Sequence, residues 1–499
     1  MLNKSFLFIL PLIAGSSVRL DPENYTALSK KQTVHPNVLF IFVDDLRPEL
    51  ACYGNSWVKS PNLDKLASEG FLFRKHYAQV PTSGASRCCL LTGMYPKTRE
   101  FLSNEAIRTS ISGLPESAHP ETFIHLLRRN GYYTSGIGKI SHYADGLLYG
   151  YEDSVGSRRE LPYSWDNLLF DPGKWGTGWN AFFGYSDGTD RQSEKGNVKP
   201  YEKGFVGDEG YPDGLTANLA IKELRALAGR KQPFFLGIGF FKPHLPFTSP
   251  SKYWDQVQES EIQLTDSPGL PVNVNKASLH QSSEFNGYKA GDEEATLESP
   301  LSDDYAKKIK HAYAACVGYV DEQIGKVIAE LDSSGLADNT IIVVWGDHGW
   351  HLGDHNIWGK HTVFEYALRS TLIIKIPHPE KAPSIIENII SSVDIYPTLM
   401  ELCGVKMPFT TDGKSFADLL MKGKPEKREE IAYGYYRNGI SMRTEKYRLT
   451  KYFRKEEPTI ELYDYSSDPY ENKNIAAERP AVVRELMPLL EKADNGIFH

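Results

Sequence analysis

The sequence predicts an α/β protein in which helices cover both faces of a large, mostly parallel β-sheet, followed by a smaller C-terminal α+β subdomain of antiparallel strands. Three observations support this prediction. Three runs of the chain are continuously apolar rather than alternating, which is typical of strands buried on both faces, and residues 132–140 form a weaker strand candidate. Segments with helical periodicity separate these runs. After residue 430, short strand candidates follow one another without long helices between them.

Each of these four strand candidates ends in charged or imidazole side chains. The candidates are residues 38–43, 132–140, 234–241 and 341–345. The polar residues at their ends are Asp44 and Asp45, Lys139 and His142, His244, and Asp347 and His348. Because open α/β sheets bind ligands at the carboxyl ends of their strands, we expect these residues to share one site.

Helices are expected between and after the strands, at residues 61–70, 120–130, 215–228, 302–334 and 391–402. The clearest is 302–334, where apolar residues such as Ile309, Tyr313 and Val320 recur at three- and four-residue spacing. Ser302 and the two aspartates after it form a favourable helix N-terminus.

Two long polar stretches, residues 145–212 and 255–300, interrupt this pattern. Because long loops in a compact enzyme are usually functional or mobile, we expect them to rim the pocket and select the substrate. Disordered surface insertions are the alternative.

The later chain predicts a boundary between a catalytic domain at residues 35–425 and a subdomain at residues 430–499. A docking segment at 412–420 and a charged connector at 422–430 precede the boundary. The expected elements of the subdomain are strands at 431–435, 439–443, 447–452 and 461–463 and a helix at 480–495.

The N-terminus has the layout of a secretory signal peptide, which we assign to residues 1–17. Lys4 precedes an apolar run at residues 6–14, and small residues follow it. A buried first strand is the alternative. The run is too short for a stop-transfer helix, and no other stretch is long enough to cross a membrane. We therefore expect an exported protein without a membrane span.

The overall charge limits the partners. Lys and Arg number 56 against 64 Asp and Glu, so the net charge is −8, which argues against a nucleic-acid partner. An acidic protein that binds an anion must concentrate its cations locally. The five cysteines are too few and too scattered for a disulfide framework. Cys88 and Cys89 are expected to be packed helix residues, with a redox role as the alternative.

Asp44 and Asp45 are adjacent carboxylates, which repel each other when they lose water. A hard divalent cation with oxygen ligands offsets this repulsion, which indicates calcium or magnesium. Asp347 and His348 can complete the ligand shell, although histidine is a less usual calcium ligand. A helix cap or a surface turn is the alternative for either pair.

Six residues supply cations and proton donors that together could surround a small tetrahedral anion: Arg87, Lys139, His142, His244, His355 and Lys360. Arginine can hold oxygens in a fork, whereas lysine supplies a point charge. Backbone amides that open the helix near Ser86 add positive potential. Each of these residues alone is more often an ordinary surface or core residue.

Residues 83–93 read Ser-Gly-Ala-Ser-Arg-Cys-Cys-Leu-Leu-Thr-Gly, which fits the sulfatase signature; a plain N-cap turn is the alternative for this run alone. Over residues 35–480 the chain resembles the formylglycine-dependent sulfatases of the alkaline-phosphatase superfamily, and most of all the iduronate-2-sulfatase group. The motifs of the subgroup are Val43-Asp-Asp-Leu-Arg-Pro48, Gly138-Lys-Ile-Ser-His142, Phe241-Lys-Pro-His-Leu-Pro-Phe247 and Gly346-Asp-His-Gly-Trp-His-Leu-Gly-Asp-His355 with Trp358-Gly-Lys360.

The resemblance implies an alkaline-phosphatase-like fold and a sulfuric ester hydrolase. It implies that Ser83 is oxidised to formylglycine, whose aldehyde hydrate attacks sulfate esters. The implied ligands of one Ca²⁺ ion, which is favoured over Mg²⁺, are Asp44, Asp45, Asp347, His348 and an oxygen of modified Ser83. The resemblance implies that Arg87 and Lys139 stabilise the aldehyde hydrate. It implies that substrate is bound by Lys139, His244, His355 and Lys360. It also implies that His244 donates a proton to the leaving alcohol and that His142 acts as the base when the aldehyde is regenerated.

Two residues depart from the common pattern of the family. Position 83 holds serine, where animal members have cysteine, and Ala85 replaces the common proline. Because serine-type maturation is a bacterial route, we expect a bacterial protein, periplasmic or secreted, that depends on a serine-type formylglycine-generating maturation enzyme.

The expected function is hydrolysis of sulfate esters by exo action on sulfated carbohydrates, such as 2-O-sulfated uronic acids or related polysaccharide fragments. One alternative is hydrolysis of phosphate or phosphonate esters by unmodified Ser83. The other is a binding protein with an inactive site.

Overall fold

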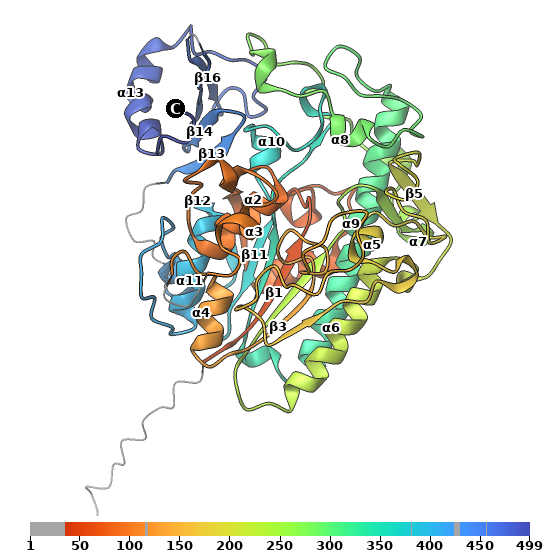
Figure 1. The fold of residues 1–499 in the computed structure, drawn as a ribbon. Helices are drawn as coiled ribbons and strands as arrows, with labels where there is room; N and C mark the ends of the chain where they lie inside the picture. The colour runs from red at the N-terminus through yellow and green to blue at the C-terminus, as the bar shows by residue number, and fades with distance from the viewer. Residues whose placement is uncertain (1–34, 115–117, 381, 424–429, 456) are drawn as a thin grey trace, which may run out of the picture. The chain divides into compact units, whose positions relative to one another are not determined.

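An eight-stranded mixed sheet runs through the protein in the order β12-β2-β11-β8-β1-β6-β3-β4 (Figure 1). The computed structural model describes residues 35–114, 118–380, 382–423, 430–455 and 457–499. The expected signal peptide and most of the expected connector at 422–430 lie outside the described residues. The strands of the sheet are β1 (Asn37–Val43), β2 (Phe71–Tyr77), β3 (Tyr133–Gly138), β4 (Asn167–Leu169), β6 (Phe234–Phe240), β8 (Thr340–Gly346), β11 (Leu372–Lys375) and β12 (Ser384–Ser391).

The four predicted strands lie side by side as β8, β1, β6 and β3, and they are all parallel. Their register brings their carboxyl ends level: Val43 pairs with both Gly346 and Phe240, and Gly138 pairs with Gly239. Strand β11 runs antiparallel to both of its neighbours. The prediction of a mostly parallel sheet is therefore confirmed.

Four strands of the sheet, β2, β4, β11 and β12, were not predicted, and β4 is a strand of three residues within the long polar stretch 145–212. Arg74 and Lys75 interrupt β2, and Glu387 interrupts β12, so neither segment reads as a continuous apolar run. Strand β11 has only four residues. The side chain of Arg74 is exposed, which explains why a charged residue is tolerated within a strand.

Alternate side chains of β1 enter two separate hydrophobic layers. One layer contains residues of α2 (Ser83–Thr92), α4 (Phe123–Arg129) and α11 (Ile395–Leu402); the other contains residues of α1 (Pro61–Glu69), α6 (Pro212–Ala228) and α9 (Asp303–Ser333). In Figure 1, α4 and α11 lie on one side of the central strands and α6 and α9 on the other. Burial of one large apolar side chain contributes roughly 1.5–3 kcal/mol to folding stability. Because the side chains on both faces of β1 are buried, apolar residues are favoured at every position of this strand.

All five predicted helices are present, but two begin later than expected. Helix α4 begins at Phe123, because the side chain of Thr122 caps it by accepting a hydrogen bond from the backbone nitrogen of His125. Helix α11 begins at Ile395, because the residues before it complete β12 and a short turn that is closed by a capping box.

A separate sheet of four antiparallel strands lies near the C-terminus, as predicted (Figure 1). Its strands are β13 (Ala432–Tyr436), β14 (Gly439–Arg443), β15 (Tyr447–Tyr452) and β16 (Thr459–Asp464). Leu486 and Leu490 of α13 (Pro480–Glu491) belong to the same hydrophobic layer as α2 and α4. Arg448 of β15 also pairs with Glu365 of α10 (Glu365–Leu368), which ties this sheet to the central region.

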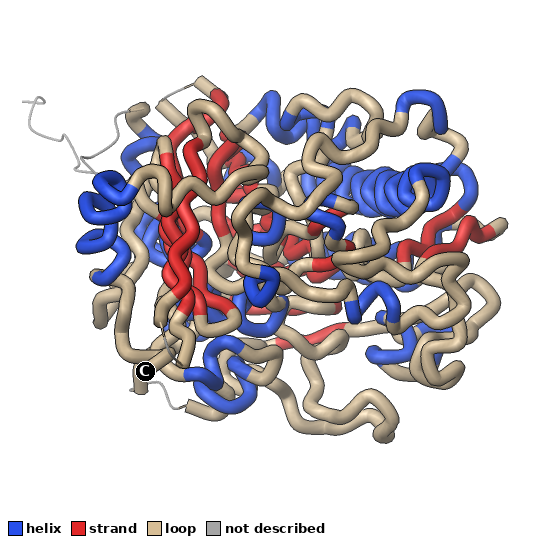
Figure 2. The backbone as a smooth tube through the Cα atoms, turned by 90° about the horizontal axis from the view of Figure 1, so that it is seen from above, coloured by secondary structure: helices blue, strands red, loops and turns tan. Residues whose placement is uncertain are grey.

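Short elements complete the described fold, and loops make up much of the molecule when it is seen from above (Figure 2). The remaining strands form the pairs β5 (Tyr201–Gly204) with β7 (Phe247–Pro250) and β9 (His351–Leu352) with β10 (Trp358–Gly359). The remaining α-helices are α3 (Ala106–Ser110), α5 (Gly178–Phe182), α7 (Ser251–Trp254), α8 (Ser283–Asn286) and α12 (Ala417–Met421).

None of the five cysteines forms a disulfide bond, and Cys88 and Cys89 are buried in the hydrophobic layer around α2. Their packing agrees with the expectation for these two residues. Over the part of the chain that the structure describes, no helix combines the length and the apolar character needed to cross a bilayer.

Asp321 of α9 caps the start of α1 across the fold, and its removal tests this contact. Its carboxylate accepts hydrogen bonds from the backbone nitrogens of Asn62 and Leu63 at 3.2 and 2.8 Å. We expect Asp321→Ala to lower the free energy of unfolding by about 1–3 kcal/mol, because these donors lose their acceptor. The control is Asp332→Ala, an exposed position on the same helix, with an expected change below about 0.5 kcal/mol. Equal urea denaturation curves for the two variants would contradict the cap.

Candidate active site

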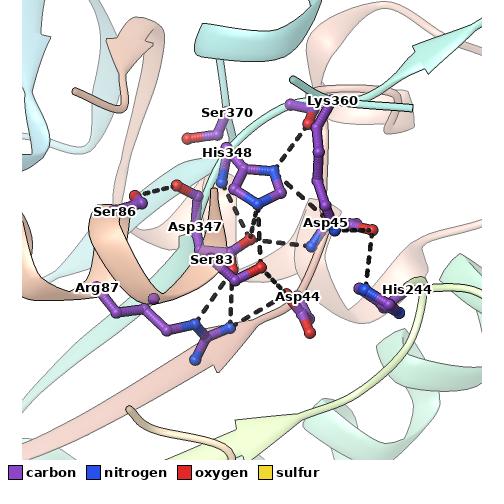
Figure 3. Close-up of polar contacts among 12 residues, drawn as sticks. Asp44, Asp45, Ser83, Ser86, Arg87, His244, Asp347, His348, Lys360 and Ser370 are labelled. Carbon is purple, nitrogen blue, oxygen red and sulfur yellow. Dashed lines mark hydrogen bonds and ion pairs between the residues drawn. The ribbon is translucent and has the colours of Figure 1, made fainter. Parts of the chain in front are cut away.

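The structure brings together polar side chains from the carboxyl ends of the four central strands, and Figure 3 shows those that follow β1, β6 and β8. Asp44 and Asp45 follow β1, Asp347 and His348 follow β8, Lys139 and His142 follow β3, and His244 follows β6. These residues are far apart in the sequence, so their proximity results from the strand order and the register. All of them are buried.

Ser83 lies at the centre of this cluster, at the first residue of α2. Its Oγ donates a hydrogen bond to Oδ1 of Asp44 at 3.0 Å and lies 3.1 Å from Nε2 of His348 (Figure 3). The next position, 84, has room only for glycine, because a Cβ atom there would lie 2.2 Å from the backbone oxygen of Asn104. The helix start places partial positive charge beside the Ser83 oxygen.

Asp44, Asp45, Asp347 and His348 form a cluster with the composition of a metal site. Each residue offers one ligand atom, and these atoms lie within 4.8 Å of one another. The backbone of Asp45 adopts a left-handed φ of 58°, so the two adjacent carboxylates are not forced to opposite sides as they would be in a strand.

The electrostatics of the carboxylates fit a divalent ion. Burial raises the pKa of Asp45 to about 7, because the charges of Lys360 and His348 offset the loss of water only in part. Burial and the charge of Asp44 likewise raise the pKa of Asp347. The cations of the protein therefore leave these two carboxylates incompletely stabilised, and a hard cation with oxygen ligands would complete the balance.

His348 offers a lone pair to the same cluster. Its Nδ1 lies 2.9 Å from the carbonyl oxygen of Gly349. Because a carbonyl oxygen can only accept a hydrogen bond, we assign the ring proton to Nδ1. The Nε2 atom that faces Ser83 is then free to act as a ligand.

Arg87 and Lys139 hold Asp44 and Asp347. Arg87, fully buried in α2, donates from Nε to Oδ2 of Asp347 at 3.1 Å and lies 3.5 Å from Oδ1 of Asp44. The Nζ atom of Lys139 donates to Oδ2 of Asp44 at 2.5 Å. Burial by itself raises the pKa of Asp44, but Lys139, His244 and Arg87 together hold it well below its ordinary value.

Lys360 and His244 meet Asp45 and an unpredicted residue, Glu284 of α8. Lys360 Nζ lies 3.0 Å from Oδ1 of Asp45 and 3.3 Å from Oε1 of Glu284. The Nε2 atom of His244 lies 3.2 Å from the same Glu284 oxygen. Burial by itself lowers the pKa of Lys360, but the two carboxylates raise it, so the amine stays charged.

A cavity of about 130 Å³ opens beside Ser83, and five of the predicted site residues line it: Ser83, Lys139, His142, His244 and Lys360. Both long polar stretches also line it. Tyr151, Trp179, Phe182, Phe183 and Arg191 come from residues 145–212, and Glu284 and Tyr288 come from residues 255–300. The two stretches therefore rim the pocket, as expected. A groove of about 810 Å³ elsewhere contains none of the predicted site residues.

Two of the residues that the sequence analysis missed lie in the long polar stretches at 145–212 and 255–300. Arg191 and Glu284 follow no apolar strand, so no strand-end pattern marks them. His361 also lines the cavity, and its position directly after Lys360 is a signal that could have indicated it.

His142 and His355 differ in their positions. His142 lines the cavity, and its buried Nδ1 has no hydrogen-bond partner. Burial and the charge of Lys139 hold the pKa of His142 well below its ordinary value, so the ring is neutral. His355 does not line the cavity, so the structure does not place it beside the other residues that were expected to bind substrate. Its φ of 56° lies in a short turn, and its Nε2 contacts the carbonyl oxygen of Tyr470 at 3.0 Å.

Comparison with known proteins agrees with this geometry. Residues 36–405 match the Sulfatase family, and residues 353–495 match the family described as N-sulphoglucosamine sulphohydrolase, C-terminal. The chain is 30% identical to iduronate 2-sulfatase of Homo sapiens, over 88% of this chain and 90% of that protein.

Solved structures share the fold. Phosphonate monoester hydrolase of Agrobacterium radiobacter superposes with a TM-score of 0.72 at 23% identity, over 92% of this chain and 95% of that one. A protein in complex with its substrate D-glucosamine-2-N,6-O-disulfate superposes with a TM-score of 0.69 at 24% identity, over 92% and 97% of the two chains.

The Sulfatase match covers most of the chain and includes the whole cluster around Ser83. It agrees with the alkaline-phosphatase-like architecture of a mostly parallel sheet flanked by helices. The chain belongs to the sulfatase family and is a sulfuric ester hydrolase.

Proposed function

We propose that the protein hydrolyses sulfate esters of carbohydrates by exo action, with Ser83 converted to formylglycine and one calcium ion beside it. The observation that carries the proposal is the position of the Ser83 Oγ atom, between Asp44 and His348 and at the wall of the cavity. Formylglycine supplies an aldehyde hydrate as the nucleophile. A small cavity of about 130 Å³ favours a single terminal sugar over the interior of a chain.

Asp44, Asp45, Asp347 and His348, with an oxygen on residue 83, would hold the calcium ion. When bound, calcium offsets the negative charge of the sulfate oxygens and favours the ionised nucleophile. Three buried carboxylates form a dedicated protein site, which suits Ca²⁺ better than Mg²⁺, because Mg²⁺ usually keeps several waters.

The basic residues of the chain bind the ester and move protons. Lys139 and Lys360 line the cavity and can hold sulfate oxygens, while Arg87 and Lys139 support the nucleophile through Asp44 and Asp347. We assign His244, in its protonated imidazolium form, as the acid for the leaving alcohol. Its Nδ1 contacts the carbonyl oxygen of Leu245, which leaves Nε2 facing the cavity region near Glu284. Each proton transfer contributes roughly 10²–10⁴-fold to the rate.

His142 is our candidate for the base that regenerates the aldehyde. A base must be unprotonated before it acts, and burial keeps this imidazole neutral. Its unpartnered Nδ1 is available to accept a proton within the cavity region.

The lining of the cavity supports a carbohydrate substrate. Tyr151, Trp179, Phe182 and Phe183 present aromatic rings, which can pack against the apolar face of a sugar. The name of the human relative, iduronate 2-sulfatase, describes action on a sulfated uronic acid. We therefore infer a sulfated carbohydrate fragment, with a 2-O-sulfated uronic acid as the first substrate to test.

We also propose that the protein is a bacterial export, periplasmic or secreted, and that a serine-type maturation enzyme modifies it. The support is the signal-peptide layout of residues 1–17 and the serine at position 83. Both inferences rest on the sequence.

The mass of tryptic peptide 76–87 tests the modification of Ser83. In active protein, we expect this peptide to be lighter than its sequence mass by two hydrogens, because a serine alcohol has become an aldehyde. Protein from a host without the serine-type enzyme should show the full serine mass and no sulfatase activity. An active native preparation that contains only unmodified peptide would refute the mechanism and favour phosphoester hydrolysis by Ser83.

Asp45→Ala tests the metal site. We expect the variant to lose bound calcium and to lose at least about 100-fold in kcat/KM for sulfate release, because one carboxylate ligand is missing. Atomic emission spectrometry measures the metal, and ion chromatography measures the sulfate. The exposed control Asp332→Ala should keep both. Wild-type activity in metal-free Asp45→Ala protein is the result that rules out the assignment.

A further inference from the structure

The cavity wall carries one cation that the proposed sulfate chemistry does not use, Arg191. It comes from the long stretch at residues 145–212 and lines the same cavity as Ser83. The volume of about 130 Å³ is small. A sugar whose sulfate lies at Ser83 therefore brings its other substituents close to Arg191.

Aromatic rings hold the side chain of Arg191. Its Cζ atom lies 5.3 Å from the ring centroid of Phe183 and 4.9 Å from that of Tyr288, within the range of cation–π attraction. The backbone of Gly287 also approaches closely, because a Cβ atom there would lie 2.9 Å from Nη2 of Arg191. The guanidinium is therefore packed between the two long stretches.

Hydrogen bonds also fix the backbone around Arg191. Its nitrogen donates to the carbonyl oxygen of Phe183 at 3.2 Å. The carboxylate of Asp190 accepts hydrogen bonds from the backbone nitrogens of Gln192 and Ser193 at 2.8 and 2.9 Å. A cation on such a turn is positioned before a ligand arrives, which lowers the entropy cost of binding.

Arg191 lacks a counter-ion, unlike the two lysines of the cavity. Lys139 pairs with Asp44, and Lys360 pairs with Asp45 and Glu284. Within the described ranges, no carboxylate forms an ion pair with Arg191, and its buried Nε has no hydrogen-bond partner. A partly buried guanidinium with an unpaired N–H group and no counter-ion is unfavourable, and an anionic ligand group would supply both partners.

We propose that Arg191 forms a second anion subsite, which binds a carboxylate or a second sulfate on the same sugar as the ester that is cleaved. The planar guanidinium presents parallel N–H donors, which match two oxygens of either group. This inference rests on the proposed carbohydrate sulfatase function and narrows it. The substrate is a sugar unit with two anionic groups.

Three substrates that differ in one substituent test the subsite: a 2-O-sulfated hexuronic acid, the matching 2-O-sulfated hexose, and the matching 2,6-di-O-sulfated hexose. Mass spectrometry follows loss of the 2-sulfate and gives kcat/KM for each. The mature full-length wild type should prefer one doubly anionic sugar over the singly sulfated hexose by about 10- to 100-fold. The preferred sugar identifies the anion as carboxylate or sulfate.

Variants at Arg191 should change this preference. Arg191→Gln should abolish most of the preference for the doubly anionic sugar. Arg191→Lys keeps the positive charge but not the paired N–H donors of the guanidinium, so this variant should retain part of the preference. The matched control is Arg158→Gln, an exposed arginine in the same stretch, which should keep the wild-type preference. Because the readout is a ratio of two substrates on one protein, partial misfolding does not alter it.

The outcomes separate this subsite from the proposed function. A wild type that hydrolyses all three sugars equally, or an Arg191→Gln variant with the wild-type preference, overturns the subsite and leaves the carbohydrate sulfatase function standing. A wild type that cleaves 4-methylumbelliferyl sulfate but none of the sugars overturns both.

Discussion

The burial of three carboxylates at neighbouring strand ends is the constraint on which the rest of the site depends. Asp44, Asp45 and Asp347 are removed from water, and each needs a compensating charge. Arg87, Lys139 and Lys360 supply part of it through direct contacts. The same cations are the groups that the proposed mechanism uses to support the nucleophile and bind sulfate. The residues that offset the buried negative charge are therefore the same residues that the proposed mechanism uses. The proposed calcium ion supplies the remaining positive charge.

The fold meets this constraint through the order and register of the parallel strands. Strands β8, β1, β6 and β3 are neighbours, and their ends are level, so short segments after each strand converge without long loops. Hydrophobic layers on both faces hold the strands in place. Ser83 reaches the same point from a different direction, at the start of a helix that packs in one of those layers. Much of the substrate-facing wall comes from the long stretches at 145–212 and 255–300, which can vary without disturbing this arrangement.

The parts of the site that could be predicted from sequence are those with a local signature. Asp44 and Asp347 stand at the ends of apolar runs, and Ser83 lies in a compact motif. Glu284 and Arg191 could not be predicted in this way, because their position depends on how long loops fold over the sheet. His355 belongs to a recognisable motif, but it lies in a left-handed turn, and its ring contacts the carbonyl oxygen of Tyr470 instead of the cavity. Strands with charged residues, such as β2, were missed because exposure of one side chain breaks the apolar pattern.

Calcium binding to chelator-treated protein tests the central claim most directly. Isothermal titration calorimetry with CaCl₂ measures how many calcium ions bind per chain and with what affinity. The account predicts one ion per chain, bound more tightly at pH 8 than at pH 5, because burial raises the pKa of Asp45 to about 7 and protons compete with the ion below that value. Absence of binding in protein that hydrolyses sulfate esters at the full rate would contradict it.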